Sequence, residues 1–432
     1  MVRAHGWIPF LVPVFLLTAG CGRGPQAAPA GEGAAGAPAW RQAELRQAPP
    51  PAGAGAMAPQ LTVAGGEVLL SWIEPLAGGA GEEHRLLIAE LEVGSGTWSA
   101  PHEITRGKGF FANWADLPAV AAGADRVLVA HWLEKLGAGP YAYGAQLARS
   151  TDGGVGWERM GLLHDDASPT EHGFVSWVPV DGGLQAFWLD GRAMEGGDGG
   201  HDGHDGHGGP AGGGMQLRTA LVAEGEPQQS ALLDDRVCEC CATDAALTAA
   251  GPVVVYRDRS ESEIRDIAIV RQTPQGWSGP AIVAQDGWEI AGCPVNGPAV
   301  AADGEQVVVA WFTASDATPQ VLAAFSTDGG ASFGEPVVVD GERPLGRVAV
   351  ALAEDGGAFV SWLGSKGEGA ELRLARVGAG GPAGEARGIA DTTARRAAGV
   401  PRMVRAGDDL VFAWVEDVEP SRLAAAVLPA PR

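Results

Sequence analysis

One sequence motif recurs seven times along this chain and constrains the fold more than any other feature. Each copy is an apolar run behind a Gly or Asp turn, and six of the seven runs reach a Trp. The closing residues lie 51 to 69 residues apart and are Trp72, Trp132, Trp188, Arg257, Trp311, Trp362 and Trp414. A period of roughly 40 to 60 residues with several strands per unit is typical of β-propeller blades. We therefore predict an all-β fold, a β-propeller of four-stranded antiparallel blades.

The number of units predicts seven blades, with six as the alternative if one weak unit forms no blade of its own. The last unit, from Pro401 to Leu428, runs out of chain after its third strand. We expect residues 40–45, which begin with Trp40, to supply the missing outer strand. A strand from the N-terminal side closes the ring and removes an exposed sheet edge.

Two turns carry a sharper pattern, S-x-D-x-G-x-x-[WF], at residues 150–157 and 326–333. The Asp side chain accepts backbone N–H bonds within its own turn, and the Gly residues permit positive φ. These turns resemble the Asp-boxes, or bacterial neuraminidase repeats, of the sialidase-like β-propeller superfamily. Together with the phrases CECCATD, YRDRS and GCPVNGP, they make the chain similar to exported bacterial lipoproteins of that superfamily without an assigned reaction. The resemblance implies a propeller over residues 38–430.

The resemblance does not extend to the residues that working sialidases use. Those enzymes hold a carboxylate with three Arg and attack with a Tyr paired to a Glu. The chain has three Tyr, and none lies in the last third, where that nucleophile is expected: Tyr141, Tyr143 and Tyr256. A carbohydrate-active, exo-sialidase-like hydrolase is therefore the alternative function. Its catalytic residues are unknown, with Asp190, Asp258 and Arg257 as candidates.

The N-terminus resembles the signal peptide of a bacterial lipoprotein. Residues 1–21 contain a positive Arg3, an apolar run over residues 7–17 and the sequence Leu-Thr-Ala-Gly before Cys21. The resemblance implies lipidation of Cys21, while an ordinary secretory signal is the alternative. Residues 22–37 form an Ala/Gly/Pro tether without apolar periodicity. We expect an exported monomer in the cell envelope, at the outer membrane or in the periplasm, held to the membrane only by its N-terminal lipid.

The formal charge of −23 argues against nucleic acid as a partner, because phosphate binding needs a basic face. The links between second and third strands and the links between blades share one rim, because successive strands run antiparallel. Unusual residues gather on that rim, mostly in units three to five. We expect this rim to bind a small anionic or glycan ligand or an envelope protein. The candidate ligand-binding residues are His164, His172, Arg192, Arg257, Arg259, Trp288 and Asn296.

Arg257 stands where the other six units have Trp. A buried Arg needs a carboxylate or an anionic ligand. One interpretation is an internal ion pair with Asp258, Asp190 or Asp266. The other is an anion clamp in the central pocket, assisted by Arg192 or Arg259.

Apart from Cys21, the cysteines number four, and an even number in an exported chain favours two disulfides. One bridge is expected to run between neighbouring loops to Cys293. A thiolate metal site with a nearby His and free redox thiols are the alternatives. The four residues are Cys238, Cys240, Cys241 and Cys293.

The longest unit contains a Gly/His-rich insertion over residues 194–215. Within it, His201, His204 and His207 are spaced by three residues with Asp between them. Imidazole and carboxylate groups together suit Zn or Cu, and a low-complexity repeat without function is the other interpretation. The sequence demands no cofactor, and a metal-binding envelope protein is the third candidate function.

Overall fold

The computed structural model describes residues 39–430 apart from 77–82, 124–125, 195–212 and 417. The signal peptide, Cys21, the tether and the three histidines His201, His204 and His207 lie outside the described residues. None of the described helices is long and apolar enough to cross a membrane.

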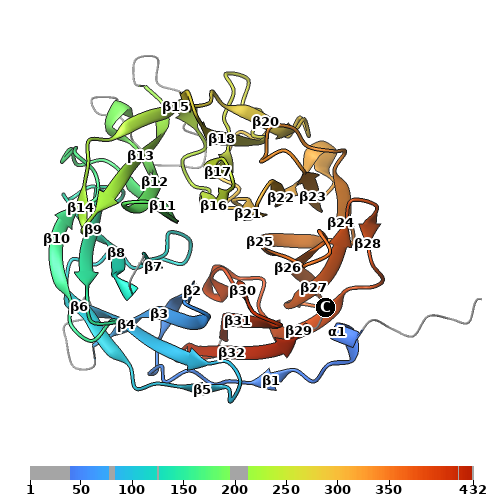
Figure 1. Cartoon of the computed structure of the whole chain (residues 1–432), viewed down its shortest axis with the longest axis horizontal. Helices are drawn as coiled ribbons and strands as arrows, with labels where there is room; N and C mark the ends of the chain where they lie inside the picture. Colours follow the sequence, from blue (N-terminus) through green and yellow to red (C-terminus); the bar gives the residue numbers. More distant parts are fainter. Residues whose placement is uncertain (1–38, 77–82, 124–125, 195–212, 417, 431–432) are drawn as a thin grey trace, which may run out of the picture. The chain divides into compact units, whose positions relative to one another are not determined.

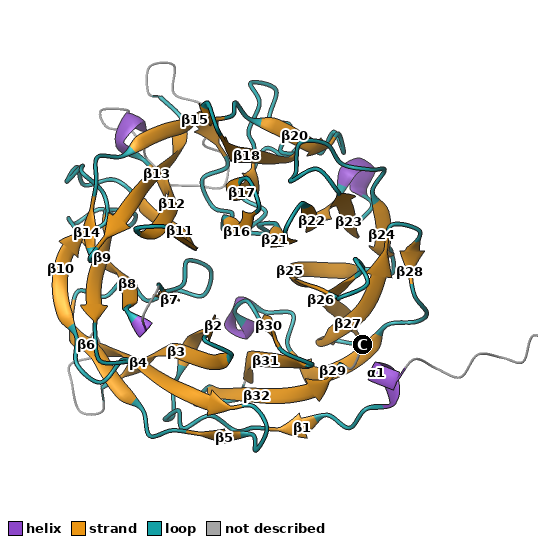
Figure 2. Cartoon of the chain, in the orientation of Figure 1, coloured by secondary structure: helices purple, strands orange, loops and turns teal. Residues whose placement is uncertain are grey.

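The described chain forms seven antiparallel sheets arranged as a ring, which confirms the predicted β-propeller and its seven blades (Figure 1). The alternative of six blades is wrong. Figure 2 shows that helix contributes only short turns to the described chain, among them α1 (Ala39–Gln42), η2 (Arg192–Met194), η3 (Ser315–Ala317) and η4 (Arg396–Ala398). The first blade contains β2 (Met57–Ala64), β3 (Glu67–Pro75), β4 (Glu83–Glu92), β5 (Thr97–Trp98) and β6 (His102–Lys108). The second contains β7 (Ala119–Ala122), β8 (Leu128–Lys135), β9 (Tyr143–Ser150) and β10 (Glu158–Leu162). The third contains β11 (His172–Val180), β12 (Gly183–Asp190), β13 (Met215–Ala223), β14 (Glu226–Pro227) and β15 (Ala231–Val237). The fourth blade contains β16 (Asp244–Thr248), β17 (Gly251–Arg257), β18 (Ile267–Thr273), β19 (Gly276–Trp277) and β20 (Ala281–Ala284), and the fifth contains β21 (Ala299–Asp303), β22 (Gln306–Thr313), β23 (Gln320–Ser326) and β24 (Val337–Asp340). The sixth contains β25 (Pro344–Leu352), β26 (Ala358–Lys366), β27 (Gly369–Gly378), β28 (Gly381–Pro382) and β29 (Arg387–Thr392). The seventh contains β30 (Arg402–Ala406), β31 (Asp409–Glu416), β32 (Arg422–Pro429) and β1 (Arg46–Gln47).

The hydrophobic core is divided among the seven interfaces between neighbouring blades. The second strand of a blade is buried on both faces, which explains why its sequence is a continuous apolar run. In β22, for example, every residue after Gln306 is buried. One apolar cluster fills each interface, so each blade is stabilised by two neighbours.

The six recurrent Trp residues all bury their indoles, and five of them donate the indole N–H to a carboxylate. In three blades the acceptor lies two residues further along the same strand, as in Trp72 with Glu74 at 2.7 Å. Trp132 with Glu134 and Trp188 with Asp190 follow the same rule, at 2.9 Å and 2.8 Å. In two further blades the acceptor comes from the preceding blade or the segment after it, in the pairs Trp311–Asp286 and Trp362–Asp340, both at 2.6 Å. A buried donor without a partner costs free energy, so these carboxylates are part of the fold.

The ring is closed by an N-terminal strand, as predicted, but not by residues 40–45. β1 supplies the outer strand of the last blade, and Arg46 pairs with Val427 of β32. Trp40 instead lies in α1, is 3% exposed, and packs edge-on against Phe359 at 5.8 Å between ring centroids. The aromatic therefore fills the interface of the last two blades.

Both S-x-D-x-G-x-x-[WF] turns form the predicted hydrogen bonds within themselves. Asp152 accepts from the backbone N–H groups of Val155 and Gly156, and Asp328 accepts from that of Ser332. In each turn the two Gly residues have positive φ, between 68° and 93°. The bonds to Asp328 lower the pKa of its carboxyl to about 2.

Replacing Trp362 with Phe tests the indole–carboxylate bond. The variant keeps an aromatic ring but removes the donor to Asp340, which is a buried carboxylate. We expect a loss of about 1–3 kcal/mol in the free energy of unfolding, measured from urea denaturation. Trp277→Phe is the matched control, because that ring packs edge-on against Phe187 and its substitution removes area without this bond. Equal losses in the free energy of unfolding of Trp362→Phe and Trp277→Phe would contradict a stabilising bond between Trp362 and Asp340.

Candidate functional site

The rim residues predicted from the third blade form one group around His172. Its Nδ1 lies 3.3 Å from Asp190 and its Nε2 3.3 Å from Asp166, and its ring stacks on that of His164 at 4.0 Å. Burial, and then the neighbouring His172, lower the pKa of His164 to about 4. Burial would raise the pKa of Asp190, but contacts with His172 and Arg192 outweigh it and hold that pKa well below the usual range. Asp190 is thus a fixed anion and a poor candidate for a general acid.

The His172 group also has the composition of a metal site, since Asp166, His172 and Asp190 place ligand atoms within 4.8 Å of one another. The Asp190 oxygens already accept from Trp188 and from Arg192, whose Nε lies 2.7 Å away. A guanidinium at that position competes with a cation. The donor set therefore serves the structure better as an ion-pair network than as a metal centre.

Arg257 corresponds to neither interpretation of the sequence. Its guanidinium donates to the backbone carbonyls of Asn296, Arg265 and Phe312 at 2.6–3.1 Å, and it lies 4.9 Å from the Trp288 ring centroid. Among the described residues no carboxylate forms an ion pair with it, so the predicted partners Asp258, Asp190 and Asp266 are wrong. Its donors are also committed, so the expected anion clamp is not formed.

The other predicted arginines are neutralised by carboxylates. Arg192 pairs with Asp190 and with Asp165 at 2.8 Å, while Arg259 pairs with Glu239 at 2.5 Å and Glu263 at 2.7 Å. Asp258 is half-buried and bridges Val237 through its backbone. The structure thus brings the predicted rim residues together in blades three to five, but as structural contacts.

Asn296 and Trp288 both contact Arg257. The Asn296 side chain accepts the Arg347 backbone N–H at 2.8 Å, and its carbonyl binds Arg257. Trp288 is 7% exposed and packs against Phe312. Asn296 also lines the cavity on the ring axis that is described below, so it connects Arg257 with that cavity. Trp288 belongs to the hydrophobic core.

The four cysteines converge on the same rim. Cys240 and Cys293 form the predicted disulfide between neighbouring loops, with Cα atoms 5.9 Å apart. The expected second bridge is absent, because Cys238 and Cys241 are buried thiols whose sulfurs lie 3.5 Å apart. Burial opposes ionisation of Cys238, but its contacts with Cys241 and Arg265 lower its pKa to about 7. Burial and Cys238 raise the pKa of Cys241.

A tyrosine between two carboxyls adjoins this cysteine group, and the sequence interpretation missed it. The Tyr143 hydroxyl lies 2.5 Å from Glu171 and 3.1 Å from Asp116. Burial raises the pKa of Asp116 to about 7 and that of Glu171 to about 8, although the Tyr143 bond opposes both shifts. Burial and the two carboxyls raise the pKa of Tyr143, so its phenol stays protonated. One phenol proton cannot serve two carboxylates, and the trio holds an additional carboxyl proton near neutral pH.

A cavity of about 350 Å³ runs along the ring axis, lined by the innermost strands of all seven blades and by inter-blade residues of the same rim. Two arginines line it without a carboxylate partner among the described residues, Arg347 and Arg402. Arg347 donates to the Gly399 carbonyl at 2.7 Å and lies 4.9 Å from the Trp114 ring centroid. The Nε of Arg402 is buried and has no hydrogen-bond partner in the described chain. Burial lowers the pKa of both to about 10, and Asp244 opposes that shift at Arg402.

A signal for Arg402 was present in the sequence. Pro118-Ala119 and Pro298-Ala299 open the innermost strands of two other blades with a small residue, whereas Pro401 is followed by Arg402. Arg402 thus places a charge where these two blades have an Ala. Nothing in the spacing indicates Tyr143, because its contacts depend on an inter-blade loop lying against β9.

The comparisons with known proteins show the fold alone. No protein-family model and no curated protein matches the chain. A polysaccharide lyase of family PL25, an ulvan lyase bound to -[GlcA(1-4)Rha3S]-, superposes with a TM-score of 0.56 at 11% identity, over 89% of this chain and 96% of that chain. The NanB sialidase from Streptococcus pneumoniae gives 0.39 at 11% identity over 87% and 68%, and the phage phi92 endosialidase 0.47 at 10% over 91% and 70%. The class is thus a seven-bladed β-propeller whose structural neighbours include sialidases and a polysaccharide lyase.

The pH dependence of stability tests the Tyr143 trio. Because the folded-state pKa values of Asp116 and Glu171 lie above ordinary carboxyl values, the folded state binds more protons than the unfolded state between about pH 4 and pH 8. Their contribution to stability is therefore full below pH 4 and is lost as the pH rises through 7 and 8. We expect Glu171→Gln to reduce the fall in the unfolding midpoint between pH 5 and pH 8.5. The exposed control Glu92→Gln should leave that fall unchanged, and an unchanged fall in Glu171→Gln contradicts the trio.

Proposed function

We propose that this protein is an envelope binding propeller whose central channel and inter-blade rim hold a small anionic group of a glycan, a carboxylate or a sulfate. The observation that carries this proposal is Arg402, a channel-lining guanidinium with a buried, unpartnered Nε and no ion pair to a described residue. Asp244 acts on Arg402 electrostatically but forms no hydrogen bond or ion pair with it in the described chain. A buried guanidinium donor is therefore left unsatisfied, and a bound anion relieves that cost. Arg347 and Arg396 add positive charge at the Trp114 end of the channel.

The lining of the cavity suits a sugar residue. Trp177 and Phe174 offer apolar surface, and the hydroxyl groups of Ser176 and Thr243, which bond to each other at 2.8 Å, add a polar patch. Ligand sites in proteins combine a mostly apolar wall with a few placed polar groups. The ulvan lyase with the same fold is bound to a repeat that contains an acidic sugar and a sulfated sugar, which is in keeping with this choice of ligand.

The proposal includes export and lipid anchoring through Cys21. The Cys240–Cys293 disulfide supports an oxidising compartment outside the cytoplasm. Mass spectrometry of the protein isolated from membranes tests the anchor: a diacylated Cys21 at the N-terminus is expected, and a cleaved N-terminus without lipid contradicts it.

A second candidate is a carbohydrate-active enzyme, favoured by Asp116. This carboxyl lines the channel and has a pKa of about 7, which is a suitable value for proton exchange near neutral pH. The binding function is preferred because Tyr143 and the Phe174 backbone N–H, 2.7 Å away, already occupy the carboxyl oxygens. Release of reducing ends or unsaturated products from anionic polysaccharides would establish the enzyme instead.

Substitution of Arg402 tests the anion site directly. We expect wild-type protein to bind oligogalacturonate but not neutral malto-oligosaccharides in isothermal titration calorimetry. Arg402→Gln should weaken that binding about 10- to 100-fold, because a hydrogen bond to a charged group contributes roughly 1.5–3 kcal/mol. The control Arg422→Gln lies in the same blade, but its side chain is 66% exposed and pairs with Glu416. Equal affinity in Arg402→Gln and wild type argues against the site.

The pH dependence of that affinity gives an independent check. Burial raises the pKa of Asp244 to about 6, and both Asp244 and Asp116 line the channel. The two carboxyls are mostly protonated at pH 5 and charged at pH 8.5, whereas Arg402 remains charged at both. We expect oligogalacturonate to bind more weakly at pH 8.5, and Asp244→Asn to reduce the difference. Affinity that is constant across this range contradicts the location of the site.

A further inference from the structure

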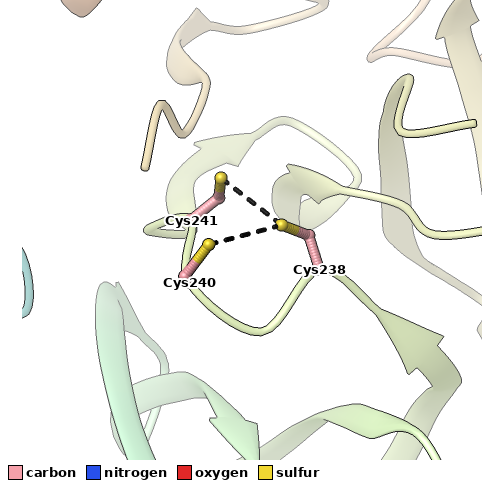
Figure 3. A group of neighbouring side chains, drawn as sticks. All are labelled: Cys238, Cys240 and Cys241. Carbon is pink, nitrogen blue, oxygen red and sulfur yellow. Dashed lines mark hydrogen bonds between the residues drawn. The ribbon is translucent and has the colours of Figure 1, made fainter. Parts of the chain in front are cut away.

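Three sulfur atoms meet on the rim of the fourth blade, and dashed lines join the Sγ of Cys238 to those of Cys240 and Cys241 (Figure 3). Its Sγ is 3.5 Å from the thiol of Cys241 and 3.9 Å from the Sγ of Cys240. Cys240 in turn is bonded to Cys293. The buried Cys238 thiol thus lies near both a second buried thiol and a disulfide.

Exposure differs sharply along this series. Cys238 and Cys241 are 0% and 1% exposed, Cys240 is half-buried and Cys293 is exposed. Solvent and partner molecules therefore reach the disulfide at Cys293, while the two thiols are reached only from inside.

We propose that the four cysteines form a thiol–disulfide relay that moves the disulfide between the exposed pair Cys240–Cys293 and the buried pair Cys238–Cys241. The external reactant is the disulfide of a small molecule or peptide that contacts Cys293. This activity is separate from the anion site in the channel.

The relay needs two exchange steps and no internal oxidant. The Cys238 thiolate attacks the Sγ of Cys240, the Cys238–Cys240 bond forms, and Cys293 leaves as a thiolate that takes up a proton. The Cys241 thiolate then attacks the Sγ of Cys238, and Cys240 leaves as the second thiol. One disulfide and two thiols are present throughout, and two protons pass from the buried pair to the exposed pair.

The exposed dithiol can then reduce an external disulfide. That reactant gains two electrons and two protons and becomes two thiols, while the Cys240–Cys293 bond is restored. The protein ends with two disulfides, Cys240–Cys293 and Cys238–Cys241. This is one of the two pairings of the four cysteines that avoid a vicinal Cys240–Cys241 bridge.

The surroundings of Cys238 favour a nucleophilic thiolate. The Arg265 guanidinium donates to its Sγ at 3.1 Å, and a nearby cation stabilises a thiolate. The other ionisable groups that act on Cys238 are Glu239, Glu171 and Cys241. Glu239 is itself bound by Arg265 at 3.0 Å, which limits its repulsion of the thiolate.

The contact between Arg265 and Cys238 also argues against a metal site at these cysteines. Arg265 occupies the sulfur lone pairs of Cys238 with a positive N–H, and the Arg257 guanidinium acts on Cys241. Both charges oppose a bound divalent cation. Cys240 is already bonded to Cys293, so it offers no thiolate.

The test uses the folded full-length chain and 5,5′-dithiobis(2-nitrobenzoate) as the external disulfide, without added reductant. We expect wild-type protein to release two equivalents of thionitrobenzoate more than Cys238→Ser. After acid quenching and digestion without reduction, mass spectrometry should find a Cys238–Cys241 bond in wild type. Cys241→Ser should stop after the first step, with Cys293 labelled and a Cys238–Cys240 bond.

The role of Arg265 separates the relay from general access to the thiols. Arg265→Gln should slow thionitrobenzoate release at pH 7 at least tenfold, and raising the pH should restore the rate. Arg265→Lys, which keeps the charge, should retain most of the wild-type rate. Thermal unfolding of each variant identifies any that fail to fold.

Two results would overturn the relay. One is a wild-type release equal to that of Cys238→Ser, with the Cys240–Cys293 bond as the sole disulfide of the rim. The other is one equivalent of zinc or copper in protein purified without an affinity tag, lost when Cys238 and Cys241 react.

Discussion

The bond between a buried indole N–H and a carboxylate organises this propeller. It occurs in five of the described blades, and in each it fixes the large side chain that fills the interface to the next blade. The carboxylates then recruit arginines: Glu74 pairs with Arg85 at 2.8 Å and Asp340 with Arg373 at 3.2 Å. An apolar core in seven separate clusters is thus bordered, in these five blades, by polar contacts that position the second strand of the blade.

Where this bond is replaced, the chain gains unusual chemistry. Arg257 takes the place of an indole, and its guanidinium holds the backbone at Asn296 and Arg265. Asn296 donates its backbone N–H to Cys241 at 3.4 Å, and Arg265 binds Cys238. The exceptional blade is therefore the one whose loops carry the cysteines. The replacement of the recurrent Trp by Arg257 thus supports the polar rim that carries the cysteines, because an indole has only a single N–H donor.

The blades could be predicted because strands covered on both faces must be apolar, and that requirement repeats along the sequence. The closing strand was misplaced because β1 has two residues, which is too short for any alternation, and the conspicuous Trp40 belongs to α1 instead. The partners of Arg257 are backbone carbonyls, and those have no signature in a sequence. Tyr143, Asp116 and Glu171 meet only because the ring places an inter-blade loop against β9. A disulfide to Cys293 followed from adjacent loops, but the sequence did not indicate that Cys240 is its partner.

The pairing of β1 with β32 also fixes the order of assembly. The last blade needs Arg46 and Val427 together, so the ring cannot be completed until β32 has been synthesised. Until then the first and the last finished blades present unprotected faces and edges, which invite intermolecular association. The seventh interface and the edge of the last blade are therefore protected only in the final step of assembly, when two segments from opposite sides of the sequence meet.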